Sequence, residues 1–128
     1  MRVFATGMLD LDDLDKWLTA GAKIVSVTMM SNVLGTITPI QEIARRCHAH
    51  GAICVIDGEQ GVAHLHTNVQ EIGCDFLAFS GHKMCGPTGI GVLWGKRALL
   101  EKMEPFLGGG EMISKVEYRT STWNVIES

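Results

Sequence analysis

Short apolar runs alternate along this chain with segments in which apolar residues recur every three or four positions. The runs have the length of buried strands, and the other segments have the spacing of helices with one buried face. This alternation predicts an α/β fold with a largely parallel sheet, which helices cover on both faces in a three-layer arrangement. The predicted strands are residues 23–28, 52–57, 75–79 and 90–94.

Two segments carry a helical pattern with clear ends. Asp10 is a capping residue in front of residues 11–20, and Gly21 ends that helix. Pro39 occupies the favoured first-turn position of a second helix, which Gly51 ends. Shorter helices are predicted at residues 69–72 and 96–103. The predicted apolar faces are Leu11, Leu14, Trp17 and Leu18 in the first helix, and Ile40, Ile43, Ala44 and Cys47 in the second, with Glu42, Arg45 and Arg46 left for solvent.

Composition and charge narrow the class of protein. The 128 residues are 46% hydrophobic and 20% charged, which predicts one soluble domain with a core. The formal net charge is -3 and the basic residues are scattered, which argues against a nucleic-acid or anionic-membrane partner. No apolar run has the length of a bilayer crossing. These features predict a cytoplasmic protein.

The four cysteines are spaced irregularly and form no C-x-x-C pair. Three of them lie in apolar surroundings, where a free cysteine behaves as a small hydrophobic residue. We therefore expect reduced thiols rather than a disulfide framework, in agreement with a cytoplasmic location. The residues are Cys47, Cys54, Cys74 and Cys85.

Reactive side chains follow two of the predicted strands. Asp57 ends one apolar run, and Ser80, His82 and Lys83 follow the next one. Open α/β sheets bind their ligands at the carboxyl ends of the strands. A lysine and a carboxylate presented together are suited to pyridoxal 5'-phosphate, which is held by a lysine and paired with an acid at its ring nitrogen. The sequence therefore predicts a site for this cofactor.

Each candidate also has a simpler interpretation. Lys83 could be a solvated loop lysine, and Asp57 could cap the segment that starts at Glu59. Ser80 and His82 offer donors for a phosphate. The remaining candidates are Gln60, which could reach a ring hydroxyl or lie on the surface, and Asn32, which could donate into the cleft or stabilise a turn.

The residues also suggest two other kinds of site, a metal site and a nucleotide site. His64 and His66 would share a face of an extended segment, and Cys74 or Cys85 could join them around a metal, but no third ligand has a recognised spacing. The glycine-rich residues 86–91 lead into a strand rather than a helix, and they lack the order of the phosphate-binding motifs. Both signals are weaker than the cofactor pattern.

Three segments, residues 31–39, 55–60 and 79–93, closely resemble the class V aminotransferase family. Within that family they are most similar to cysteine desulfurases of the SufS/CsdA type, which also include selenocysteine lyases. The resemblance runs over roughly residues 10–113. It implies that residues 1–128 are a single truncated domain, the central part of the large domain of a fold-type I transferase that depends on pyridoxal phosphate.

The resemblance also implies an activity and partners. Such enzymes convert L-cysteine to L-alanine and pass the sulfur on as a persulfide, so the implied substrate is cysteine or selenocysteine. A homodimer and a sulfur-acceptor protein are implied as partners. In the implied site, Lys83 holds the cofactor and moves the α-proton, Asp57 pairs with the ring nitrogen, Gln60 contacts the phenolic oxygen, Ser80 and His82 bind the phosphate, and Asn32 lies near the substrate.

The sequence departs from the family in ways that bear on activity. Family members are much longer, and the segments that carry the sulfur-accepting cysteine and the carboxylate-binding arginine have no counterpart here. None of the four cysteines is predicted to be the acceptor. Glu59 stands where a small residue is usual, and Cys85 replaces a common aromatic residue. The alternative expectation is a non-catalytic remnant of the fold that acts as a binding or structural module.

Overall fold

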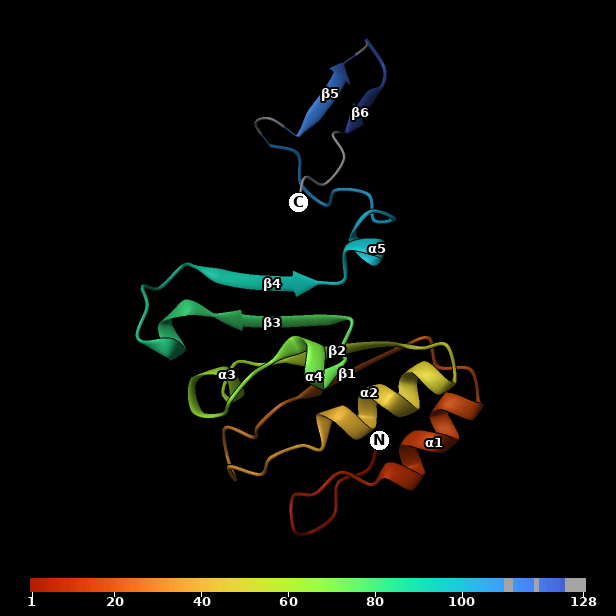
Figure 1. Cartoon of the computed structure of the whole chain (residues 1–128), viewed down its shortest axis with the longest axis vertical. Coiled ribbons are helices and arrows are strands. Elements are labelled where there is room, and N and C mark those ends of the chain that lie inside the picture. The colour runs from red at the N-terminus through yellow and green to blue at the C-terminus, as the bar shows by residue number, and fades with distance from the viewer. Residues whose placement is uncertain (110–111, 117, 124–128) are drawn as a thin grey trace. The chain divides into compact units, whose positions relative to one another are not determined.

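The chain divides into two units, Met1–Trp94 and Gly95–Ser128 (Figure 1). The structure is a computed structural model that describes residues 1–109, 112–116 and 118–123. The predicted site residues all belong to the first unit. That the 128 residues form a single truncated domain stays a prediction.

The first unit is built on a four-stranded sheet with the order β1-β2-β3-β4. β1 (Ile24–Thr28) runs parallel to β2 (Ile53–Asp57), which runs parallel to β3 (Phe76–Ser80). β4 (Gly91–Gly95) lies at the edge and runs opposite to β3 (Figure 1). The α/β fold class with a largely parallel sheet is therefore confirmed.

In the described residues, helices pack against one face of this sheet, and the covering of both faces in three layers stays a prediction. α2 (Ile40–Ala49) packs against β1 and β2, and it also contacts α1 (Leu11–Thr19) and α4 (Val69–Ile72). Because side chains alternate along a strand, every second residue faces these helices. The inward strand residues Val27, Cys54, Ile56 and Leu77 are buried, and so is the whole predicted stripe of α2: Ile40, Ile43, Ala44 and Cys47.

The predicted apolar face of α1 needs one correction. Leu14 and Leu18 are buried, but the side chain of Trp17 is 58% exposed. Trp17 lies three positions from Leu14 on a helix of only nine residues, which presents a narrow stripe to α2. The cap is as predicted, because Asp10 Oδ1 accepts hydrogen bonds from the N–H groups of Asp12 and Asp13, both at 3.1 Å.

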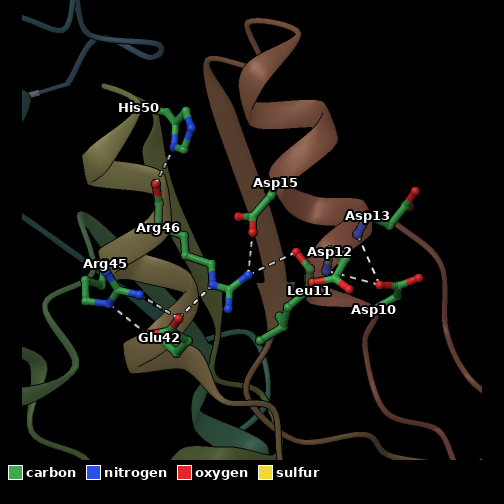
Figure 2. A network of polar contacts seen from close by, with 9 residues as sticks. All are labelled: Asp10, Leu11, Asp12, Asp13, Asp15, Glu42, Arg45, Arg46 and His50. Carbon is green, nitrogen blue, oxygen red and sulfur yellow. Dashed lines mark hydrogen bonds and ion pairs between the residues drawn. The ribbon is translucent and has the colours of Figure 1, made fainter.

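The expectation that Arg46 faces solvent is wrong. Its guanidinium is half-buried and donates to Asp15 Oδ2 at 2.6 Å, to the carbonyl of Leu11 at 3.2 Å and to Glu42 Oε1 at 2.7 Å (Figure 2). Arg45, which is exposed, donates to both oxygens of Glu42. These two hydrogen-bonded arginines lower the pKa of Glu42 from 4.5 to about 2. Arg46 thus joins α1 to α2.

A buried carboxylate makes polar contacts in the core between segments that are distant in the sequence. Asp75 is 5% exposed, and its Oδ2 accepts from the N–H of Cys54 at 2.8 Å and lies 2.9 Å from His48 Nε2. None of the four cysteines forms a disulfide, and three of them are buried as predicted. Burial raises the pKa of Cys54 to about 12, so its thiol stays protonated at neutral pH.

Several elements differ from their predicted form. Two short helical segments, α3 (Gly61–His64) and η1 (Gly81–Met84), lie outside the predicted helices. In the second unit, α5 covers only Arg97–Leu100 instead of residues 96–103. β5 (Ile113–Val116) and β6 (Ser121–Trp123) form an antiparallel pair in the tail that the pattern left unassigned. The three consecutive glycines predict a break in regular structure, which Gly108 and Gly109 show, and Gly110 lies outside the described residues.

Candidate functional site

The carboxyl ends of the parallel strands bring the predicted site residues to one edge of the sheet. Asp57 lies opposite Thr28 on one side and Ala78 on the other. Since strand side chains alternate, Asp57, Ala78 and Ser80 face the same side, away from α2. The sheet register thus places a carboxylate and a hydroxyl on a shared face of neighbouring strands.

Asp57 is exposed and also has a local role. Its Oδ1 accepts a hydrogen bond from the N–H of Glu59 at 2.9 Å. The simpler interpretation was that Asp57 caps a helix from Glu59 onward, but α3 starts at Gly61 and its cap position is Gln60, so this contact is a local turn. It directs the chain after β2 toward β3, where the N–H of Gly58 donates to the carbonyl of Ala78 at 2.8 Å. The turn therefore places Glu59 beside the end of β3.

The side chain of Glu59 contacts two of the predicted site residues. Ser80 Oγ donates to Glu59 Oε2 at 2.5 Å, and Lys83 Nζ lies 3.2 Å from the same oxygen. The hydrogen bond from Ser80, followed by that from Lys83, lowers the pKa of Glu59. Glu59 therefore links Asp57, through its backbone, to Ser80 and Lys83, through its carboxylate. We name Asp57, Glu59, Ser80 and Lys83 the strand-end cluster.

Lys83 reaches Glu59 because the loop after β3 folds back on itself. The N–H of Gly81 donates to the carbonyl of Ile90 at 2.8 Å, and the N–H of Gly86 donates to that of Gly81 at 2.9 Å. A Cβ at Gly86 would lie 2.9 Å from the Gly81 oxygen, so only glycine fits this closure. Cys85 takes the left-handed conformation with φ of 62°. The helical turn η1 then carries Lys83 back toward β2.

The other three predicted residues lie near this edge with less defined contacts. Gln60 precedes α3 and is half-buried, and His82 lies in η1 and is exposed. Asn32 is exposed in the loop after β1, in a turn where Ser31 Oγ accepts from the N–H groups of residues 33 and 34. This loop also follows the carboxyl end of a parallel strand. Its contacts are those of a turn, one of the two roles considered for Asn32.

Tight packing behind the cluster fixes the start of α3. Gly61 is buried, and a Cβ there would lie 2.4 Å from the Cγ of Met29, in the loop after β1. Only glycine allows this approach between the ends of β1 and β2. Beyond Met29 lies a cavity of about 290 Å³ whose lining includes Thr38, Leu65 and Ile72. None of the six predicted site residues lines it.

The rival interpretations gain no support in the part of the chain that the structure describes. No three side chains of the metal-ligating types gather there, and His64 lies on α3 with His66 beyond its end. Within the same residues, no helix is long and apolar enough to cross a bilayer. Residues 86–91 close the loop onto β4 instead of opening a helix.

The fold and the strand-end cluster have the features expected of the class V aminotransferase family. Comparison with known proteins gives the same family. The sequence model of the family described as aminotransferase class-V matches residues 1–128, so this chain belongs to that family. A probable cysteine desulfurase of Halalkalibacterium halodurans is 56% identical over 117 residues, or 91% of this chain and 29% of that protein.

The similarity extends to solved structures. The crystal structure of the cysteine desulfurase CsdA from Escherichia coli superposes with a TM-score of 0.90 at 41% identity, covering 96% of this chain and 31% of that one. A structure of SspA in complex with cysteine gives a TM-score of 0.78 at 27% identity, covering 86% and 32%. The chain thus spans less than a third of the length of these relatives.

Members of this family depend on pyridoxal phosphate, and the strand-end cluster suits most of that cofactor. It offers an amine for the aldehyde, an acid for the ring nitrogen and a hydroxyl for the phosphate. Glu59 does not match this cofactor, because its carboxylate accepts the hydrogen bond of the Ser80 hydroxyl, which the phosphate would need. Sequence comparison marked Glu59 as unusual, but only the folded loop shows which groups it contacts.

Proposed function

We propose that this chain forms the cofactor-binding core of a cysteine desulfurase that depends on pyridoxal phosphate. The proposed reaction converts L-cysteine to L-alanine and delivers the sulfur as a persulfide. One observation carries the proposal: Lys83 Nζ and Ser80 Oγ both contact the carboxylate of Glu59, and the N–H of Glu59 donates to the Asp57 carboxylate at the end of β2. The names of the relatives support the same reaction.

Lys83 and Asp57 would carry the central chemistry. When bound, the cofactor supplies an electron sink for the pair of electrons released at the substrate's α-carbon. Lys83 would hold the cofactor covalently through its amine and then take up and return the α-proton. Asp57, at the end of β2, would keep a proton on the ring nitrogen, because a nearby carboxylate stabilises that positive charge.

The remaining residues would bind and orient. Ser80 and His82 would hold the phosphate, since hydroxyl and imidazole groups donate to its oxygens. Gln60 would donate its side-chain amide to the phenolic oxygen from the start of α3. Asn32 would lie near the substrate from the loop after β1. All of them stand at the carboxyl ends of parallel strands, where such sheets bind ligands.

The substrate and partners follow from the relatives. The proposed substrate is a small amino acid with a γ-chalcogen, cysteine or selenocysteine, and a bound cysteine in a structural neighbour supports this class. We further propose a homodimer in the cytoplasm and a separate sulfur-acceptor protein. The sulfur-accepting group is assigned to none of the four cysteines, three of which are buried.

The test is a titration of the purified chain with pyridoxal phosphate. We expect the visible absorbance band of lysine-bound cofactor in the wild type and in Lys23→Ala, and no band in Lys83→Ala. Lys23 is an exposed lysine directly before β1 and serves as the matched control. A folded wild-type chain without any band would contradict the proposal and favour a non-catalytic binding module. Alanine release from L-cysteine then tests the reaction itself.

A further inference from the structure

Glu59 holds both groups through which the cofactor would be anchored. Its Oε2 accepts the hydrogen bond of Ser80 at 2.5 Å and lies 3.2 Å from Lys83 Nζ. A serine hydroxyl has a single proton to donate. While Ser80 donates to Glu59, it cannot donate to a phosphate oxygen.

The carboxylate of Glu59 is also charged when it makes these contacts. Its lowered pKa, which the Ser80 and Lys83 hydrogen bonds cause, keeps it ionised at neutral pH. A phosphate that approached Ser80 would meet a like charge on the same hydroxyl, and like charges at such distances repel.

The fold does not depend on this side chain. The position of Glu59 is fixed by backbone contacts, because its own N–H donates to Asp57 and the N–H of Gly58 donates to Ala78. The side chain itself is 31% exposed, and its carboxylate contacts two side chains at the end of the neighbouring strand. The charge can therefore be removed without disturbing the core.

We propose that Glu59 is an internal competitor for the cofactor phosphate, which holds Ser80 and Lys83 in the cofactor-free chain and must release Ser80 before the phosphate binds. The inference rests on the proposed function and adds a regulating residue to the same site. The consequence is that a higher concentration of pyridoxal phosphate is needed for binding. A cofactor analogue without the phosphate would be affected less, because it competes with Glu59 for Lys83 alone and not for Ser80.

The experiment compares two ligands on four forms of the full chain. Wild type, Glu59→Gln, Glu59→Ala and the control Glu42→Gln are each titrated with pyridoxal phosphate and with pyridoxal, followed by absorbance at equilibrium. Glu42 is also a glutamate paired with cations, but it lies on α2. Circular dichroism of each variant establishes that it is folded.

We expect both Glu59 variants to bind pyridoxal phosphate about tenfold more tightly than wild type, as removal of one nearby like charge predicts. Pyridoxal should gain clearly less affinity from the Glu59 substitutions than pyridoxal phosphate does, because only the contact of Glu59 with Lys83 affects its binding. Equal affinity of wild type and both Glu59 variants for pyridoxal phosphate would overturn the inference while leaving the proposed function intact. The same gain with pyridoxal would also overturn it, because the competition would then not concern the phosphate. No absorbance band in any folded form would overturn the proposed function, and the inference with it.

Discussion

Glu42 and Glu59 are both glutamates with lowered pKa values that meet cationic side chains, yet they stand in different kinds of surroundings. Glu42 belongs to a network on α1 and α2 in which Arg46 ties the two helices together (Figure 2). Glu59 belongs to the strand-end cluster, where Ser80 and Lys83 converge on one carboxylate oxygen.

The difference separates stability from chemistry. The Glu42 network lies on α1 and α2, two helices that already pack against each other, and α2 carries a buried apolar stripe. The strand-end cluster lies on the sheet face away from α2 and presents an amine, a hydroxyl and carboxylates beside one another. Changes in the first region should therefore alter unfolding, and changes in the second should alter ligand binding.

The largest expected effect comes from the core beneath the network. Ile43 is fully buried on α2, so Ile43→Ala should lower the free energy of unfolding by about 3 kcal/mol through lost burial and a cavity. Denaturant unfolding measures this. The control is Ile24→Ala on β1, where the side chain is 63% exposed and little change is expected. Equal losses for both would contradict the assignment of the core to the helix side.

Asp57→Ala tests the strand-end cluster. Loss of a charge-assisted contact to the ring nitrogen should weaken binding of pyridoxal phosphate by roughly tenfold to a hundredfold. The unfolding midpoint should stay close to wild type, because Asp57 is exposed. Equilibrium titration by absorbance measures the affinity, with the exposed Asp12→Ala on α1 as control. An unchanged affinity would remove Asp57 from the site.

A smaller effect is expected from Arg46→Ala. Its guanidinium joins Asp15, Leu11 and Glu42, so its loss should lower the free energy of unfolding by about 1 kcal/mol. Arg45→Ala is the matched control, since Arg45 is exposed and contacts only Glu42 among the acceptors of this network. A greater loss of unfolding free energy in Arg45→Ala than in Arg46→Ala would show that the contact of Arg46 between α1 and α2 is not what stabilises the unit.

The smallest effect is the pH dependence of the Glu42 network. The folded-state pKa of Glu42, about 2, lies below its usual value of 4.5. The stabilisation is therefore present above pH 4.5 and is lost as the pH falls toward 2. Unfolding midpoints of wild type and Glu42→Gln should differ at neutral pH and converge in acid. A constant difference across this range would mean that the charge of Glu42 is not involved.

Local patterns predicted most of the fold. The strand at 52–57 and the helix after Pro39 could be recognised because their apolar spacing and their ends agree. Arg46 was misplaced because its partner Asp15 lies 31 positions away, and a helical pattern contains no information about a neighbouring helix. The pair β5 and β6 was missed because its strands are short and polar.

The candidate site was only partly predictable for the same reason. The motif identified Lys83, Asp57 and Ser80, and the strand ends bring them to one edge. The contact of Glu59 with Ser80 and Lys83 depends on how the loop closed by Gly86 folds back, which no local pattern specifies. The sequence shows that a glutamate is unusual at position 59, and the structure shows that its carboxylate contacts Ser80 and Lys83.

The most direct test of the central claim is chemical. The chain is incubated with pyridoxal phosphate, reduced with borohydride to make any lysine linkage permanent, and digested for peptide mass spectrometry. The account predicts that the reduced cofactor is attached to Lys83 and not to the exposed Lys16 or Lys23. Attachment spread evenly over the surface lysines, or none at Lys83, would contradict it.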